Sequence, residues 1–147
     1  MMKLPKGWPQ ISSTIYYDDP AAAIDWLCRV FGFEVRLKVE GEDGGIVHSE
    51  LEYGQGLVMV SSSRPAPDAT HDVPSLSPRS SGGSITQALA VFVPDVDAHY
   101  EHAKAEGAVV HGEPKTDDYG PEYWADRTYR VEDLEGHHWW FMQRVRG

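Results

Sequence analysis

The chain has few of the features that hold a secreted or membrane protein in place. It has 147 residues and a single cysteine, Cys28, which excludes a disulfide within the chain and favours a reducing compartment. Its first ten residues, MMKLPKGWPQ, lack the apolar core of a secretion signal. No apolar run approaches the roughly 18 residues of a membrane span. These absences predict a cytoplasmic protein with no membrane partner.

Positive charge is also scarce. The chain carries 13 Lys and Arg against 23 Asp and Glu, a formal net charge of −10. Such a field repels phosphate backbones, so we expect no nucleic-acid partner. The charge is compatible with a cationic small ligand, although an acidic surface that keeps the protein soluble is the plainer interpretation. The length predicts one domain, with enough buried core to fold without a disulfide or a metal.

Two stretches with the same pattern lie half a chain apart. They begin at Thr14 and Ala88, and aligning Asp19 with Asp95 gives an offset of 76 residues. Each stretch reads as an apolar strand, an aspartate, an amphipathic helix that ends at a glycine, and further strands. The pattern predicts an α+β fold made of two βαβββ units. Repeat 1 spans residues 11–62, a Ser/Pro-rich linker spans 63–84, and repeat 2 spans 85–145.

Local signals define both helices. Asp19 and Asp95 are predicted N-caps, Pro20 suits the first helical position, and Gly32 and Gly107 end the helices. Apolar residues recur at helical spacing between these limits: Ile24, Leu27, Cys28 and Phe31 in the first helix, and Val96, Tyr100 and Ala103 in the second. Cys28 is therefore expected to be an inert core thiol.

Four segments carry a family resemblance: YYDDPAAAIDWLCRVFGFEV, HSELEYGQGLVMV, VFVPDVDAHYEHAKAEGA and WADRTYRVEDLEGHHWWF. Together they resemble the vicinal oxygen chelate superfamily, which includes glyoxalase I, bleomycin-resistance proteins and extradiol dioxygenases. The resemblance implies that the two βαβββ units form a cupped, partly open mixed-sheet barrel, with the helices on the outer face and a ligand inside the cup. It leaves the chemistry open, because one scaffold hosts many activities.

The resemblance also implies four metal-ligand positions, on the first and last strands of each unit. In this sequence they are occupied by Ser12, Met59, Ala88 and Trp140. Metal-binding members use His, Gln or Glu there, because the ion needs converging nitrogen and oxygen donors. The sequence therefore predicts no metal at these positions and no cofactor.

The final strand contains two histidines in the stretch DLEGHHWWFMQ. Side chains alternate along a strand, so His138 is expected to face the cup with Trp140. His137, Trp139 and Phe141 then face the opposite side, and the two histidines cannot share a metal. His138 alone would serve as a hydrogen-bonding group or a weak base.

Other histidines offer weaker alternatives. His48 and Glu50 share one face of the stretch IVHSELEY. With His138 they could form a proton-transfer set or a displaced metal site, although a solvated strand face is the plainer interpretation. His99 and His102 have a helical spacing that can bind a surface metal, but no third ligand is evident, so ordinary exposed histidines are expected. The loop TDDYGPEYWADR is interpreted either as a cover for the pocket or as a turn.

Two functions remain open at this point. By resemblance, the first is a metal-independent binding protein of the bleomycin-resistance type that sequesters an aromatic or cationic drug or metabolite, often as a homodimer. The second is a glyoxalase-like lyase or isomerase in which His48, Glu50 and His138 move a proton, with or without a displaced metal. Arg127 would bind an anionic group or pair with a surface acid. The expected ligand-binding residues are Ser12, Tyr16, Met59, Ala88, Phe92, Trp124, Arg127, His138 and Trp140.

Overall fold

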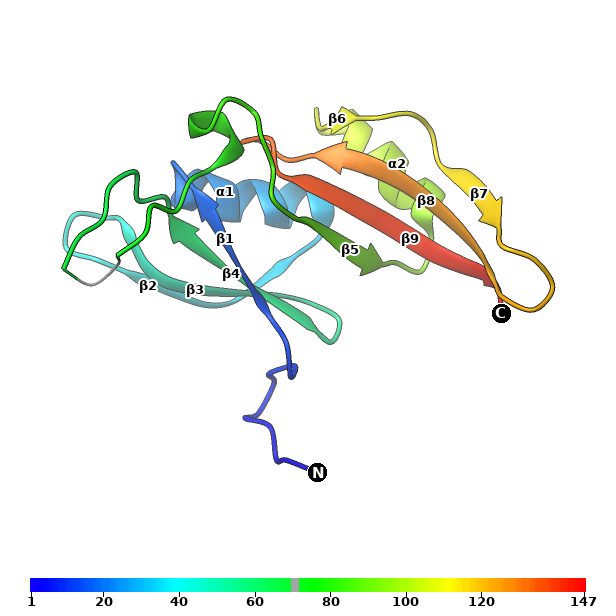
Figure 1. The fold of residues 1–147 in the computed structure, drawn as a ribbon, viewed down its shortest axis with the longest axis horizontal. Coiled ribbons are helices and arrows are strands. Elements are labelled where there is room, and N and C mark those ends of the chain that lie inside the picture. The colour runs from blue at the N-terminus through cyan, green and yellow to red at the C-terminus, as the bar shows by residue number, and fades with distance from the viewer. Residues whose placement is uncertain (70–71) are drawn as a thin grey trace. The chain divides into compact units, whose positions relative to one another are not determined.

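The structure, a computed structural model, describes residues 1–69 and 72–147. It consists of two compact units, Met1–Gly82 and Gly83–Gly147, and each is described by itself. Figure 1 shows the course of the chain through both units. Thr70 and His71, which belong to the predicted linker, lie outside the described residues.

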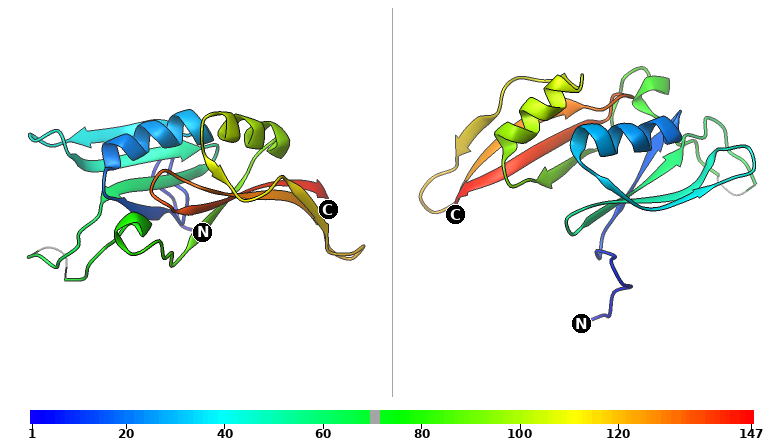
Figure 2. Two further views of the ribbon diagram at one scale, coloured as in Figure 1. Left: turned by 90° about the horizontal axis from the view of Figure 1, so that it is seen from above. Right: turned by 180° about the vertical axis from the view of Figure 1, so that it is seen from behind.

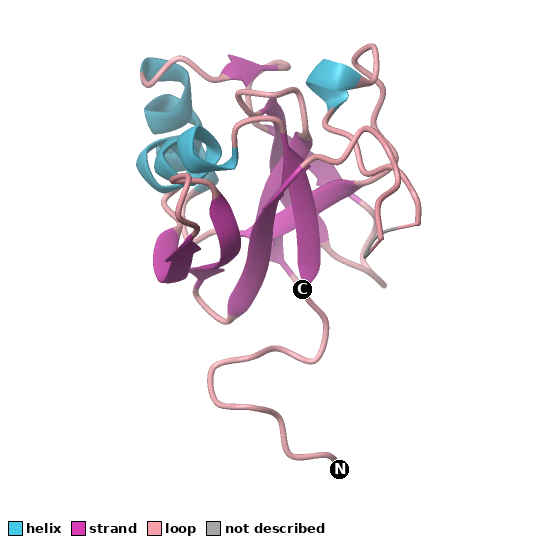
Figure 3. Ribbon diagram, turned by 90° about the vertical axis from the view of Figure 1, so that its left-hand side faces the viewer, coloured by secondary structure: helices cyan, strands magenta, loops and turns pink. Residues whose placement is uncertain are grey.

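The first unit contains a four-stranded mixed sheet. Its strands are β1 (Ser13–Tyr17), β2 (Glu34–Glu40), β3 (Ile46–Tyr53) and β4 (Gly56–Ser62). The order is β1-β4-β3-β2, with β1 parallel to β4 and the other neighbours antiparallel. Residues 1–12, all of them described, form a loop that leads into β1 (Figure 3).

The first helix, α1 (Pro20–Trp26), begins as the sequence predicts. The Asp19 carboxylate accepts a hydrogen bond from the Ala22 N–H at 3.1 Å, and Pro20 occupies the first turn. The helix continues as a single π-helical stretch, η1 (Leu27–Phe31), before Gly32 ends it at a φ of 92°. A π turn is wider than an α turn and rotates the following side chains. Leu27, Val30 and Phe31 are buried, whereas Cys28 is only half-buried, so its expected place in the core is wrong.

The second unit contains a five-stranded mixed sheet. Its elements are β5 (Ala88–Phe92), α2 (Val96–Ala105), β6 (Val109–Val110), β7 (Lys115–Asp118), β8 (Ala125–Glu132) and β9 (His138–Arg146). The order is β5-β9-β8-β6, and β7 also pairs with β8. Strand β7 falls partly in the stretch predicted as a pocket cover or turn. Residues Lys115–Asp118 instead extend the βαβββ pattern by one short strand.

In each unit one helix covers one face of the sheet (Figure 2). Helix α1 contacts β1, β3 and β4, and α2 contacts β6, β8 and β9. The largest fully buried side chains come from these layers and include Trp139, Tyr17, Phe31, Phe141, Ile15 and Leu51. The α+β class is confirmed: the described residues form two mixed sheets and no closed barrel. No described helix combines the length and apolar character needed to cross a membrane.

The described part of the predicted linker makes specific contacts. Arg64 and Ser75 form a β-bridge, and Pro78–Ser80 form a short 3₁₀ helix, η2. The Asp18 carboxylate accepts hydrogen bonds from the Ser63 hydroxyl at 2.6 Å and the Ser80 hydroxyl at 3.0 Å. Both ends of this segment are therefore held near the end of β1.

Candidate functional site

The sheet of the second unit has an open face opposite α2. Strand β9 places His138, Trp140 and Met142 on this face, and the register places Glu132, Arg130 and Thr128 beside them on β8. On the other side β5 contributes Ala88, Ala90 and Phe92. Trp140 is 41% exposed, whereas Trp139 and Phe141 are fully buried. The predicted division of β9 between an open face and a core face is confirmed.

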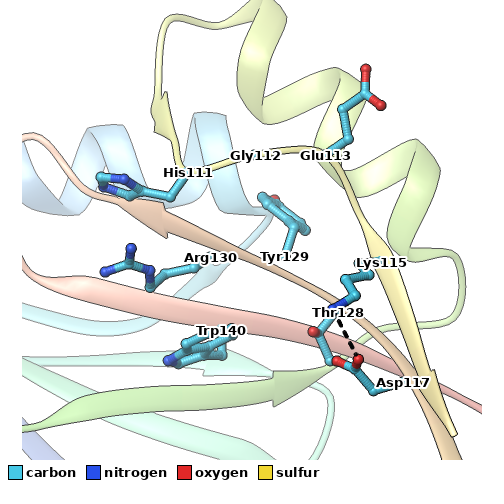
Figure 4. Close-up of a pocket in the computed structure, with 9 residues that line it drawn as sticks. All are labelled: His111, Gly112, Glu113, Lys115, Asp117, Thr128, Tyr129, Arg130 and Trp140. Carbon is cyan, nitrogen blue, oxygen red and sulfur yellow. Dashed lines mark ion pairs between the residues drawn. The ribbon is translucent and has the colours of Figure 1, made fainter.

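A pocket of about 440 Å³ lies on this face. Its walls include His111, Lys115, Asp117, Thr128, Arg130 and Trp140. Figure 4 shows the side chains of His111, Arg130 and Trp140 in a row from the end of β6 across β8 to β9. Lys115 and Asp117 form an ion pair at 3.3 Å at the other end of the pocket. The pocket therefore combines one exposed indole with groups of both charges.

Arg130 links the indole to the histidines. Its guanidinium carbon lies 5.9 Å from the centre of the Trp140 ring, a cation–π distance. Its Nη1 donates a hydrogen bond to Nδ1 of His138 at 3.1 Å. A guanidinium has no acceptor, so this bond places the hydrogen of the neutral His138 ring on Nε2.

A second arginine lies between two other aromatic rings of this unit. The Arg144 guanidinium carbon lies 5.0 Å from the Trp124 ring centre and 5.4 Å from that of Phe92. Its Nε donates to the buried Asp126 carboxylate at 2.7 Å, and this hydrogen bond raises the pKa of Arg144. The expected ligand-binding aromatics Phe92, Trp124 and Trp140 thus each have a guanidinium beside the ring.

Two histidines and a glutamate converge next to the pocket. The Nε2 of His111 and Oε2 of Glu132 are 2.6 Å apart, and Nε2 of His138 and Oε1 of Glu132 are 3.7 Å apart. The two imidazole rings stack with their centres 5.5 Å apart and an angle of 20° between their planes. Sequence reasoning found His138 but missed His111, Glu132 and Arg130. The LEG turn, residues 134–136, could have placed Glu132 opposite His138, but His111 carries no local signal.

The turn between β8 and β9 is held by the buried carboxylate of Asp133. Its Oδ1 accepts hydrogen bonds from the backbone N–H groups of Glu135 and His137, both at 3.0 Å. Its Oδ2 accepts one from the indole N–H of Trp139 at 3.1 Å. These bonds fix the hairpin register that sets Glu132 beside His138.

In the first unit, His48 and Glu50 are brought together. The His48 Nε2 lies 2.7 Å from the Glu50 carboxylate, and Nε of Arg36 lies 3.5 Å from its other oxygen. Glu50 is only 7% exposed, so the plainer interpretation, a solvated strand face, is wrong for this residue. The reason is Arg36, which covers the carboxylate and also donates to the carbonyls of Lys6 and Gly7 at 2.7 and 2.5 Å.

The other predicted residues fall into separate places. Tyr16 and Met59 are half-buried on the sheet face opposite the fully buried Ile15 and Val60, and Ser12 precedes β1. These three residues belong to the first unit, whereas the predicted residues from Ala88 onward belong to the second.

Arg127 and His99 are engaged on the helix side of the second sheet. Arg127 donates two hydrogen bonds to the Asp97 carboxylate on α2, at 2.8 and 2.9 Å, and this pairing lowers the pKa of Asp97. The structure thus separates Arg127 from Trp140 and Arg130. His99 lies 2.6 Å from the Tyr129 hydroxyl and 4.0 Å from the centre of the Phe141 ring. It is therefore not part of an exposed pair with His102.

The residues at the four family metal positions do not fit a metal. Ser12, Met59, Ala88 and Trp140 offer a hydroxyl, a thioether, a methyl group and an indole. None of these supplies the imidazole nitrogen or carboxylate oxygen that a divalent transition metal needs.

Comparison with known proteins gives a consistent picture. Residues 10–141 match the glyoxalase/bleomycin resistance protein/dioxygenase superfamily. The uncharacterized protein Rv0887c of Mycobacterium tuberculosis is 32% identical over 144 residues, which cover 94% of this chain and 76% of that protein.

Solved structures extend the comparison. TioX from Micromonospora sp. ML1 is similar at 32% identity, with a TM-score of 0.67 over 95% of this chain and 98% of that chain. TnmS3, described as an antibiotic binding protein from Streptomyces sp. CB03234, has a TM-score of 0.62 at 19% identity. The match covers 91% of this chain and 93% of the TnmS3 chain. At that identity, the likeness to TnmS3 is one of fold.

Proposed function

The chain belongs to the glyoxalase/bleomycin resistance protein/dioxygenase superfamily, and from this premise we propose that it is a small-molecule binding protein of the bleomycin-resistance type. In this proposal the protein sequesters its ligand without the metal centre of the family. The observation that carries the proposal is Trp140: an indole replaces a family metal ligand and is 41% exposed beside a pocket of about 440 Å³. The likeness to TnmS3, described as an antibiotic binding protein, supports the same class.

The pocket favours a flat ligand. A planar aromatic ring can stack on the Trp140 indole, and pockets of this size suit drug-sized molecules. Arg130 stands beside that indole and disfavours a cation there, whatever the net charge of −10 contributes at long range. Of the two ligand classes suggested by the sequence, aromatic and cationic, the local geometry therefore supports the aromatic one, neutral or anionic.

The test is a fluorescence titration with two matched probes. Anthraquinone-2-sulfonate and an anthraquinone bearing a quaternary ammonium present the same ring with opposite charges. We expect quenching by the sulfonate, with an affinity that falls at least about fivefold in Trp140→Ala, since a stacked aromatic pair contributes on the order of 1 kcal/mol beyond its buried area. Arg130→Gln should weaken binding of the sulfonate and strengthen binding of the ammonium probe, because it removes the positive charge beside the indole.

A matched control separates the site from general quenching. Trp26→Phe removes a tryptophan of α1 in the first unit and should leave both affinities unchanged. Equal binding of the sulfonate by wild-type protein and Trp140→Ala would overturn the assignment of the site. Prolonged incubation with product analysis would show whether the bound probe is released unaltered.

The second candidate is a glyoxalase-like lyase or isomerase, and one observation favours it. Glu50 is buried and lies 2.7 Å from His48, an arrangement in which a carboxylate orients an imidazole for proton transfer. This function predicts turnover of a hemithioacetal or related substrate that is lost in His48→Ala and Glu50→Gln. Retention of turnover in both variants would remove this candidate.

The family resemblance also predicts how the two units and two chains assemble. The cupped, partly open barrel within the chain and the homodimer both stay predictions from the family. An edge strand supports a dimer: β2 exposes Val35, Leu37 and Val39, each at least 40% accessible. Light scattering coupled to size exclusion measures the mass directly, and a monomer at micromolar concentration would contradict the dimer.

A further inference from the structure

We propose that His111, Glu132 and His138 form a binding site for a divalent transition metal of the zinc class, separate from the metal positions of the family. The site goes beyond ligand stacking on Trp140, which needs no ion. Its three donors come from three adjacent parts of the second sheet: the end of β6, the end of β8 and the start of β9. One ligand atom from each residue lies within 4.8 Å of the other two.

The donor set determines the class of ion. Two imidazole nitrogens and one carboxylate oxygen suit Zn²⁺, Co²⁺, Ni²⁺ or Fe²⁺, whereas Mg²⁺ and Ca²⁺ prefer oxygen donors throughout. Three protein ligands leave a coordination position for water or for a ligand atom. His111 also lines the pocket, so a bound ion would be close to a molecule that occupies it.

The distances are compatible with an ion after small movements. Donors placed about 2.1 Å from a tetrahedral metal are separated from one another by about 3.4 Å. Nε2 of His138 lies 3.7 Å from Oε1 of Glu132, which is already close to this value. Nε2 of His111 lies 2.6 Å from the other oxygen, Oε2, and must move away from it by less than about 1 Å for an ion to bind both oxygens of the carboxylate. The side chains of His111 and Glu132 are about one-third exposed, so they have room to move.

The hairpin holds two of the donors in place. Glu132 and His138 are register partners in the β8–β9 ladder, and the Asp133 carboxylate fixes the turn that joins them. The third donor, His111, is held beside β8 by its backbone N–H, which donates a hydrogen bond to the Arg130 carbonyl at 2.8 Å. The donors are thus positioned by main-chain pairing.

Arg130 opposes the ion. Its hydrogen bond to Nδ1 of His138 keeps the ring hydrogen on Nε2, the nitrogen that faces Glu132. To coordinate through Nε2, the ring must carry its hydrogen on Nδ1, and Arg130 must turn away from it. The substitution Arg130→Gln removes the positive charge and offers an oxygen that can accept the Nδ1 hydrogen, as the oxygen partners of ligating histidines do.

The experiment uses the full chain after chelator treatment and dialysis. Zn²⁺ is titrated calorimetrically, and Co²⁺ is titrated in parallel because its visible absorption reports coordination. We expect one ion per chain in the wild type and an affinity at least about tenfold weaker in His111→Ala, His138→Ala and Glu132→Gln. Arg130→Gln should bind about tenfold more tightly than the wild type.

The control is His102→Ala, which removes an exposed histidine of α2 outside the cluster and should leave the affinity unchanged. Circular dichroism checks that each variant is folded, and Glu132→Gln preserves the shape of the side chain if an alanine variant is not. No binding by the wild type, or affinities unaltered in His111→Ala and Glu132→Gln, would overturn the site. Stacking of anthraquinone-2-sulfonate on Trp140 in metal-free protein is measured separately, so failure of the metal site and failure of the proposed function are distinct results.

Discussion

The bond between Trp139 and Asp133 gives a quantitative test of how the site is held. Asp133→Asn keeps the side-chain oxygen that accepts the backbone N–H bonds of the turn. It places an NH₂ group, which cannot accept a hydrogen bond, where Oδ2 accepted the indole N–H of Trp139. Trp139 is fully buried and Asp133 is 4% exposed, so the indole donor is left without its charged acceptor. Hydrogen bonds to charged groups contribute about 1.5–3 kcal/mol, and we expect Asp133→Asn to lower the free energy of unfolding by about 2 kcal/mol.

The assay is thermal unfolding followed by far-UV circular dichroism. This signal reports secondary structure and does not depend on Trp139, which is replaced in one of the variants below. A loss of about 2 kcal/mol corresponds to a fall in Tm of roughly 4–8 °C for a chain of this size. Asp133→Ala also removes the acceptor of the backbone N–H groups of Glu135 and His137. It should lower the free energy of unfolding by about 4–6 kcal/mol in total, a large part of the stability of an ordinary domain.

A double-mutant cycle isolates the bond. In a Trp139→Phe background the indole donor is already gone, so Asp133→Asn should cost less than about 1 kcal/mol, and the cycle subtracts the cavity left by the smaller ring. An equal cost of Asp133→Asn in both backgrounds would refute the reasoning. The destabilisation would then arise from the turn alone.

Three further predictions concern other parts of the chain. Ser49→Ala should lower the free energy of unfolding by about 2–4 kcal/mol in urea denaturation, because the buried hydroxyl bonds both the N–H and the carbonyl of Val60; a change below about 0.5 kcal/mol would contradict this. Cys28 in the folded protein should react with a thiol reagent at pH 8 more slowly than in the denatured protein. Burial, together with the nearby carboxylates of Asp25 and Glu34, raises the pKa of the thiol and reduces the fraction present as thiolate. Equal reaction rates in the folded and denatured protein would contradict this prediction. The hydrogen bond to Arg127 lowers the pKa of Asp97, so the stabilisation from this pair is present above the ordinary carboxyl pKa and is lost as the pH falls through the folded pKa. The difference in unfolding free energy between wild type and Asp97→Asn should therefore shrink between about pH 5 and pH 2. A difference that stays constant over this range would refute the prediction.

Elements with local signals could be predicted from the sequence. The caps at Asp19 and Asp95 place both helices, and alternation along the final strand assigns Trp139 to the core and Trp140 to the open face. These features depend on neighbours in sequence, where propensity and periodicity act. The incomplete burial of Cys28 was missed because a π turn leaves no recognised mark in composition.

The candidate site depended on pairings between distant segments. Trp140 and His138 were found because one strand contains both. Arg130 and Glu132 required the hairpin register, and His111 required the pairing of β6 with β8, which no short-range pattern determines. The burial of Glu50 depends in the same way on Arg36 reaching across from β2.

The parallel pairing of β1 with β4 has a consequence for folding during synthesis on the ribosome. Strand β1 is the first strand of its sheet to be made, but its partner β4 is the last, after residues 18–55 have been added. At 5–20 residues per second, Ile15 and Tyr17 therefore wait roughly 2–8 s for the strand that helps to bury them. During this interval the nascent chain presents an unpaired apolar strand, and a pause in translation before Gly56 would prolong its exposure to chaperones and to other chains.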